Sequence, residues 1–151
     1  MVEAVIWQRT GRVAIHDTDA SGLIFYGAPT QWFAVAEQEL YDALGISWPM
    51  GDSEHGIATQ HLGASAPTRS YEIHLDGPLR FRELYVHDVW ISAAGRTSFA
   101  MSHEISVDGD VRVRGVVRRV YVIVDEHGVM TPAEVPQPIR DAVVDRDSVP
   151  R

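Results

Sequence analysis

Apolar and polar positions alternate with a period of two along much of the second half of the chain. In the segment 97–107 one face carries Phe99, Met101, His103, Ile105 and Val107, and the other carries Ser98, Ala100, Ser102, Glu104 and Ser106. This alternation predicts a β-strand with two unlike faces. Asp108-Gly109-Asp110 predicts a tight turn into a strand at 111–124. Ala93-Ala94-Gly95-Arg96 predicts a turn from a strand at 84–92. We therefore expect an antiparallel meander within a run of strands from about 70 to 124.

The segment from about 29 to 44 has a helical period instead. Its apolar positions recur at steps of one, three or four, as expected for one stripe of an α-helix. They are Trp32, Phe33, Ala36, Leu40 and Leu44, whereas Glu37, Gln38 and Asp42 occupy other faces. Pro29 suits the first turn of this helix. Gly45 is expected to end it.

The remaining segments complete an α+β pattern. Residues 5–16 predict a first strand with a break at Gly11, and residues 17–28 a loop. Thr131-Pro132-Ala133-Glu134 resembles a capping box that opens a short helical tail. One strand, one long helix and several antiparallel strands favour a sheet curled around a single helix. We expect one domain over residues 1–151, with a core at about 5–125 and a tail at 126–151.

Composition narrows the functional classes. The chain has 151 residues, no cysteine and a formal net charge of −8, which excludes disulfides and argues against a nucleic-acid partner. No apolar run approaches the roughly 18–20 residues that span a bilayer. The first residues lack the pattern of a signal peptide, so a cytoplasmic protein is expected. All 13 basic residues are arginine, which suits bidentate phosphate recognition but equally fits a codon bias.

Two carboxylates precede the predicted helix. Asp17 and Asp19 lie two residues apart, close to Gly22. A carboxylate can act as a general base or nucleophile, and free N–H groups at a helix N-terminus can polarise a carbonyl. The alternative is that both residues only shape a turn or cap. A calcium loop would need more oxygen ligands than this segment offers, so no metal is expected.

Other catalytic motifs are missing from the sequence. The seven histidines form no HxxxH or HExxH pair, no serine lies in a GxSxG elbow, and no GxGxxG or P-loop occurs. No cofactor is therefore expected. His16 adjoins Asp17 and could orient it.

The segment from His16 to Tyr26, followed by Trp32-Phe33, resembles the signature of the 4-hydroxybenzoyl-CoA thioesterase family. That signature is Asp-x-Asp-x-x-Gly-(apolar)-(apolar)-(aromatic), running into a helix with an aromatic pair. Weaker matches follow at Ala43-Leu44-Gly45-Ile46, at 77–81 and at 95–99, so the resemblance covers about residues 10–125.

The resemblance implies a hot-dog fold, in which an antiparallel sheet curls around a central helix. It implies Asp19 as the catalytic carboxylate and the N–H of Tyr26, together with Gly27, as the group that polarises the thioester carbonyl. The active site would lie at a dimer interface, and dimers would pair into tetramers. Arg96, followed by Thr97 and Ser98, would approach the phosphates of an acyl-CoA substrate. Trp32, Phe33 and Trp48 are candidate pocket aromatics, and the alternative for Trp32 and Phe33 is a core position.

The sequence leaves the acyl group open. Many relatives continue the loop with His-x-Asn-Tyr or Pro-Asn-Tyr, where this chain has Gly27-Ala28-Pro29, and residues 52–68 form a longer loop. The carrier of the thioester is also open, although the net charge of −8 favours CoA over an acidic carrier protein.

We therefore predict an acyl-CoA thioesterase and keep three alternatives. The first is a carrier-protein thioesterase, for which an arginine patch would offset the net charge; its members are Arg112, Arg114, Arg118 and Arg119. The second is a hot-dog dehydratase, for which His16 and Asp17 are the tempting pair, although neighbours on a strand face opposite ways. The third is a non-catalytic acyl-binding protein.

Overall fold

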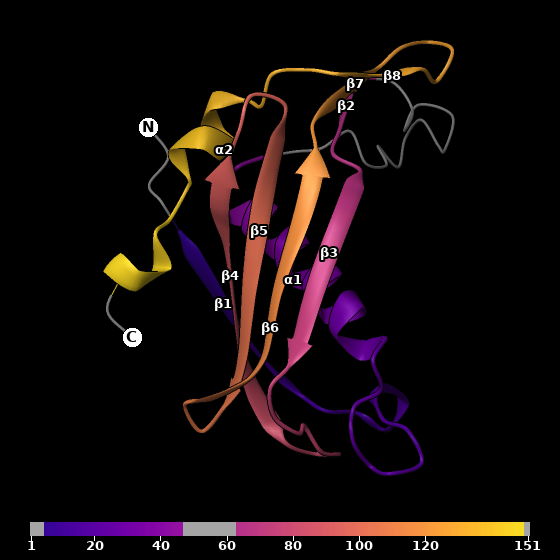
Figure 1. The fold of residues 1–151 in the computed structure, drawn as a ribbon, viewed down its shortest axis with the longest axis vertical. Coiled ribbons are helices and arrows are strands. Elements are labelled where there is room, and N and C mark those ends of the chain that lie inside the picture. The colour runs from indigo at the N-terminus through magenta and orange to yellow at the C-terminus, as the bar shows by residue number, and fades with distance from the viewer. Residues whose placement is uncertain (1–4, 47–62, 150–151) are drawn as a thin grey trace.

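A computed structural model describes residues 5–46 and 63–149, and it has the predicted α+β architecture (Figure 1). Five strands form an antiparallel sheet in the order β1-β4-β5-β6-β3, and α1 (Ala28–Ala43) lies across one face of it. The strands are β1 (Ile6–Arg12), β3 (Thr68–Leu75), β4 (Leu84–Ala94), β5 (Ser98–Val107) and β6 (Asp110–Val120). This arrangement is the expected hot-dog fold.

Shorter elements surround this sheet. A second sheet, in the order β2-β7-β8, consists of β2 (Gly63–Ser65), β7 (Val122–Val124) and β8 (Met130–Pro132). A 3₁₀ turn, η1 (Ile15–Asp17), follows β1, and α2 (Gln137–Asp141) and η3 (Arg146–Ser148) lie near the C-terminus. Trp48 and most of the predicted loop at 52–68 fall outside the described residues. None of the helices in the described ranges is long and apolar enough to cross a membrane.

The central helix begins and ends as its sequence predicts. Pro29 lies in the first turn, and the apolar stripe from Trp32 to Leu44 is buried. At the C-terminus, Gly45 has a φ of +69° and donates its N–H to Asp42, while Ile46 donates to Tyr41. This pair of bonds is a Schellman motif, and the positive φ explains why the terminating residue is glycine.

The central meander also follows the predicted alternation. All five residues placed on one face of the strand at 97–107 are buried. Asp108 and Gly109 both have positive φ, which is the geometry of a two-residue type I′ turn between β5 and β6. The prediction of three consecutive antiparallel strands, β4, β5 and β6, is confirmed.

Three local predictions are wrong. β1 continues through Gly11, and a Cβ there would lie 2.4 Å from the ring of Tyr85, so this glycine permits close packing rather than a break. The predicted strand 111–124 divides at Tyr121, because β6 belongs to the large sheet and β7 to the small one. Residues 130–132 form β8 rather than a helix start, since they pair with β7, and the helix begins at Gln137.

The C-terminal segment is part of the core. Val135, Ile139 and Ala142 are buried against residues of α1, β4 and β5. The N–H of Val144 bonds to the carbonyl of Ile91, and that of Val135 bonds to the carbonyl of Arg96. The core therefore extends beyond the predicted limit at about residue 125.

One edge of the large sheet leaves apolar side chains exposed. β3 is an edge strand, and Tyr71 and Leu75 pair with the core-facing residues Val117 and Val113, so they lie on the helix side of the sheet. They are nevertheless 59% and 49% exposed. Edge strands of this kind are usually paired or covered.

Candidate active site

Asp17 holds the loop that precedes α1. Its carboxylate accepts the N–H of Ala14 at 2.9 Å, and its carbonyl accepts the N–H of Phe25 at 3.0 Å. The side chain is buried, with His16 3.5 Å away and largely exposed. These contacts agree with the interpretation of Asp17 as a loop-shaping residue.

Asp19 is an exposed carboxylate at the tip of the same loop. Its Oδ1 accepts hydrogen bonds from the hydroxyl and from the N–H of Ser21. These two bonds, the hydroxyl bond first, lower the pKa of Asp19. The carboxylate is therefore anionic near neutral pH, which is the form required of a general base or nucleophile.

Free backbone donors lie at the start of α1. Among the described residues, the N–H groups of Tyr26 and Gly27 have no acceptor, whereas that of Ala28 bonds to Phe25. The helix dipole adds partial positive charge at this end. The ring of Tyr26 is 86% exposed, so its predicted role rests on the backbone. One loop thus presents an anion and free donors together.

Arg96, Thr97 and Ser98 lie at the other end of the sheet. The Asp19 loop contacts the chain just before β4, since Phe81 donates to Gly22 and Ile24 donates to Leu79. The hairpin with Arg96 follows the last residue of β4, which is 11 residues long. At about 3.3 Å per residue, the two ends are separated by roughly 33 Å. Within one protomer, the structure does not bring Arg96 to Asp19.

Trp32 occupies a core position. It is 7% exposed and stacks on Tyr85, with ring centroids 4.7 Å apart. This burial favours the core alternative for Trp32 over a role in substrate binding.

A buried polar network crosses the interface between α1 and the sheet. The prediction that Glu37 lies away from the apolar stripe is wrong, because its side chain is 2% exposed. Its Oε1 lies 2.9 Å from His103 Nε2, its Oε2 pairs with Arg119, and His103 Nδ1 lies 2.9 Å from His87 Nε2. Arg119 also donates to the carbonyl of Ala66 at 2.9 Å.

The hydrogen-bond directions in this network follow from Glu37, because a carboxylate can only accept. The carboxylate of Glu37 accepts from His103 Nε2, so His103 Nδ1 must accept from His87 Nε2. His87 Nδ1 is then a lone pair, and it is buried without a partner in the described structure. Burial lowers the pKa of His87 to about 2, and burial lowers that of His103 despite the opposing effect of Glu37. Both imidazoles are neutral.

Sequence reasoning missed this network, although a signal was present. The alternation in β5 placed His103 among inward apolar residues, where an imidazole needs a buried partner. Glu37 lies directly after Ala36 and three residues before Leu40, so on a helix it borders the buried stripe. Two segments distant in sequence had to be combined to find the pair.

A groove runs along α1 beside this network. One cavity of about 250 Å³ is lined by Thr30, Phe33, Ala34, Tyr71 and Val117, together with Glu37 and Arg119. A second, of about 220 Å³, shares Ala34, Glu37 and Arg119 with the first. Thr30 lies three residues after Gly27 and donates its hydroxyl to the Gly27 carbonyl. The groove therefore begins about one helical turn from the free N–H groups.

The structure does not strengthen the dehydratase or metal alternatives. His16 lies beside Asp17, whose carboxylate is occupied by the loop. The histidine–carboxylate pair His103 with Glu37 is almost completely buried, so His103 cannot touch a substrate in this arrangement. No cluster of three or more potential metal ligands occurs within the described ranges.

Comparisons with known proteins place the fold. No family model matches the sequence, and no curated protein matches it. Solved structures do match. A 1,4-dihydroxy-2-naphthoyl-CoA thioesterase from Synechocystis has a TM-score of 0.74 at 19% identity, covering 96% of this chain and all of that one.

Two further structures are similar to the same extent. A 4-hydroxybenzoyl-CoA thioesterase variant in complex with 4-hydroxybenzoyl-CoA has a TM-score of 0.73 at 19% identity, covering 93% of this chain and all of that one. A gentisyl-coenzyme A thioesterase has a TM-score of 0.71 at 22% identity, covering 91% of this chain and all of that one. At these identities the likeness establishes a shared hot-dog fold.

We predict that the buried histidines make stability depend on pH. The unfolded chain binds a proton at His87 near pH 6.5, whereas the folded chain does so only near pH 2, so stability falls as pH drops below about 6.5. The substitution His87→Gln removes this imidazole but keeps a donor for His103. Between pH 7 and pH 5, the free energy of unfolding should therefore fall by about 2 kcal/mol less in His87→Gln than in wild type. Urea unfolding at both pH values measures this difference.

The control for this experiment is His127→Gln, which removes an exposed imidazole. Its free energy of unfolding should fall between pH 7 and pH 5 by as much as that of wild type. Equal declines in wild type and His87→Gln would contradict the neutral, buried state assigned to His87.

Proposed function

We propose that this chain is an acyl-CoA thioesterase, in which Asp19 drives hydrolysis and the N–H groups of Tyr26 and Gly27 polarise the thioester carbonyl. The observation that carries the proposal is the loop before α1, which contains both an exposed anionic carboxylate and unpaired backbone donors. The fold agrees with it, because the similar solved structures include thioesterases.

The chemistry follows from these groups. The thioester oxygen accepts from the free N–H groups, which stabilise the negative charge that develops on it. Asp19 then takes a proton from the attacking water, or attacks the carbonyl carbon itself to form an anhydride that water cleaves. In both routes the C–S bond breaks, the sulfur leaves as the CoA thiolate and takes up a proton, and the acid is released.

A complete site requires a second copy of the chain. Two β3 edges that pair antiparallel about a two-fold axis place the Thr68 end of one strand beside the Leu75 end of the other. The Thr68 end lies with the Arg96 hairpin, because Thr68 pairs with Arg119, Arg119 with Phe99, and Phe99 with Ala94. The Leu75 end lies toward the Asp19 loop, because Leu75 pairs with Val113, Val113 with Ile105, and Ile105 with His87. Such a dimer would bring Arg96 of one copy toward Asp19 of the other. It would also cover Tyr71 and Leu75.

The groove along α1 suits an aromatic acyl group with a polar substituent. From a carbonyl at Gly27, an acyl group would pass Thr30 and Ala34 between the apolar surfaces of Phe33 and Val117. Farther along, where the two cavities meet, Arg119 offers N–H donors, and its charge is offset by Glu37. A neutral oxygen substituent fits this position better than an ion. The similar structures include thioesterases named for hydroxyaryl-CoA substrates.

Asp19→Asn should abolish turnover while leaving the fold intact, because asparagine keeps the shape but cannot act as a base or anion. We expect kcat for an aryl-CoA to fall by about 10²–10⁴. Asp17→Asn should be milder, since Asp17 shapes the loop. Thiol release from aryl-CoA, alkyl-CoA and acyl-carrier substrates provides the measurement. Retention by Asp19→Asn of more than about a tenth of wild-type kcat would refute the assignment. Acyl-CoA binding without thiol release from any substrate would favour the non-catalytic alternative.

The proposed dimer has a measurable mass and a measurable consequence. Sedimentation should show at least twice the 16.8 kDa of one chain. Mixing the Asp19→Asn and Arg96→Ala chains should restore activity at low substrate, because one of the two sites in each mixed dimer combines intact Asp19 with intact Arg96, which is about a quarter of all sites after random exchange. A fully active 16.8 kDa monomer would overturn this arrangement.

Arg96→Ala should act on substrate binding rather than on chemistry. Contacts to a CoA phosphate stabilise substrate and transition state alike, so the loss appears in KM. We expect KM for acyl-CoA to rise about 5–30-fold with little change in kcat. A thioester truncated to the pantetheine arm should be unaffected. Equal changes for both substrates would show that Arg96 does not contact the nucleotide.

A further inference from the structure

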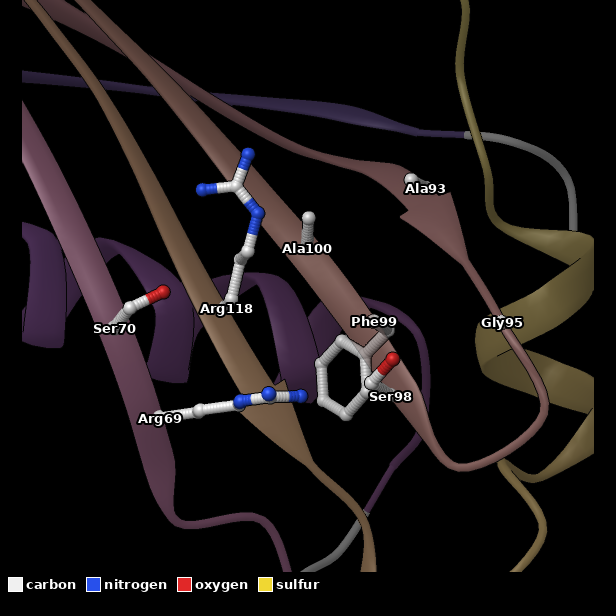
Figure 2. A pocket seen from close by; sticks show the side chains of 8 residues that line it. All are labelled: Arg69, Ser70, Ala93, Gly95, Ser98, Phe99, Ala100 and Arg118. Atoms are coloured by element: carbon white, nitrogen blue, oxygen red, sulfur yellow. The ribbon is translucent and has the colours of Figure 1, made fainter.

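A hollow of about 500 Å³ lies on the face of the large sheet that points away from α1 (Figure 2). One cross-strand row forms much of it, because Ala93 of β4 pairs with Ala100 of β5, Ala100 with Arg118 of β6, and Arg118 with Ser70 of β3. The neighbours Met101 and Val117 face the core, so this row faces outward. Three of its four side chains are small, which leaves room above the sheet.

A β-bulge adds a second arginine to the hollow. The register between β3 and β6 shifts between Thr68 and Ser70, so Arg69 is an extra residue without its own partner on β6. Bulges re-aim side chains in this way. Arg69 and Ser70 therefore both line the same cavity, although they are consecutive. Figure 2 shows Arg69 extending from β3 toward Ser98 and Phe99, and Arg118 beside Ala100.

The charge of this hollow is opposite to that of the whole chain. Its charged lining residues are Arg69 and Arg118, with no carboxylate among them, whereas the chain carries −8. Arg118 pairs with Glu72 at 3.5 Å, but both groups are about half exposed, so this bond constrains it weakly. Arg69 has no carboxylate of the described residues within ion-pair distance, and neither has Arg96 on the adjoining hairpin.

Arg69 and Arg96 differ in this respect from the four arginines of β6. The patch expected at Arg112, Arg114, Arg118 and Arg119 is not a free cationic surface, because each of these residues pairs with a carboxylate. The hairpin at the hollow is also well held. The carbonyl of Arg96 accepts from the N–H of Val135 at 2.8 Å and from Arg140 at 3.2 Å.

We propose that this hollow binds the phosphate groups of a nucleotide. Two guanidinium groups and the hydroxyls of Ser70 and Ser98 are hydrogen-bond donors suited to phosphate oxygens. Its volume is within the range of small-ligand sites. The proposal rests on the hollow itself and not on thioester hydrolysis. The CoA of the proposed function is one source of such phosphates, and a free nucleotide is another.

The test is calorimetric titration of the full chain with adenosine 3′,5′-bisphosphate, inorganic phosphate and pantetheine. Arg69→Ala and Arg118→Ala should each weaken bisphosphate binding about 5–30-fold. Pantetheine, which lacks phosphate, should show no difference between variants. The control is Arg12→Ala, which removes the same charge at the far end of the sheet and should bind as wild type does.

Three results would overturn the proposal. The first is no bisphosphate binding, and the second is binding that neither Arg69→Ala nor Arg118→Ala weakens. The third is inorganic phosphate binding as tightly as the bisphosphate, which would reject a nucleotide ligand. The bisphosphate has no thioester, so the outcome is separate from that of the proposed hydrolysis. Comparison of CoA with the bisphosphate shows whether the pantetheine arm also contributes, as expected if CoA is the ligand.

Discussion

The buried carboxylate of Glu37 is the constraint on which the position of the central helix depends. A charge in the interior is tolerated only with full compensation, and here it has two partners on the sheet, His103 of β5 and Arg119 of β6. Removing one partner of such a pair typically costs about 3–5 kcal/mol. Apolar packing alone allows a helix to slide or rotate, whereas this network specifies one register of α1 against the strands.

The register of α1 in turn positions the candidate site. The loop with Asp19 is tied to α1 at one side, where the N–H of Ala28 bonds to the carbonyl of Phe25. At the other side it is tied to the segment before β4, through the hydrogen bonds that Phe81 and Ile24 donate. Phe33 connects the two regions, since it stacks on His103 at 3.8 Å and lines the groove that leads from the helix start. The polar network and the groove therefore share one wall, and Arg119 lies where the two cavities of the groove meet.

The two faces of β6 separate two kinds of chemistry. Arg118 and Arg119 are consecutive, but Arg119 faces the buried Glu37 and Arg118 faces the outer hollow. The inner arginine is committed to a buried carboxylate, and the outer one is half exposed and bound only weakly to the exposed Glu72. Because a strand alternates its side chains, neighbours in sequence serve opposite surfaces of the sheet.

The sequence by itself determined the elements and the candidate loop. Periods of 3.6 and 2 gave α1 and the meander, because local backbone geometry controls which side chains share a face. Gly45 and Asp108-Gly109 predicted a helix end and a turn, because their positive φ is a local property. The Asp-x-Asp loop before the helix and its resemblance to the thioesterase signature made Asp19 the candidate carboxylate. In the structure this carboxylate is exposed, and two hydrogen bonds from Ser21 lower its pKa.

Only the tertiary structure decided which distant residues meet. The pairing of Glu37 with His103 and Arg119, the role of Gly11 beneath Tyr85, and the separation of Arg96 from Asp19 all depend on strand order and register. The burial of Trp32 and of the C-terminal segment depends on it as well. These contacts join segments tens of residues apart, and no local preference of the chain encodes them. They follow from the one arrangement of helix and sheet that buries the apolar faces and compensates the buried charge.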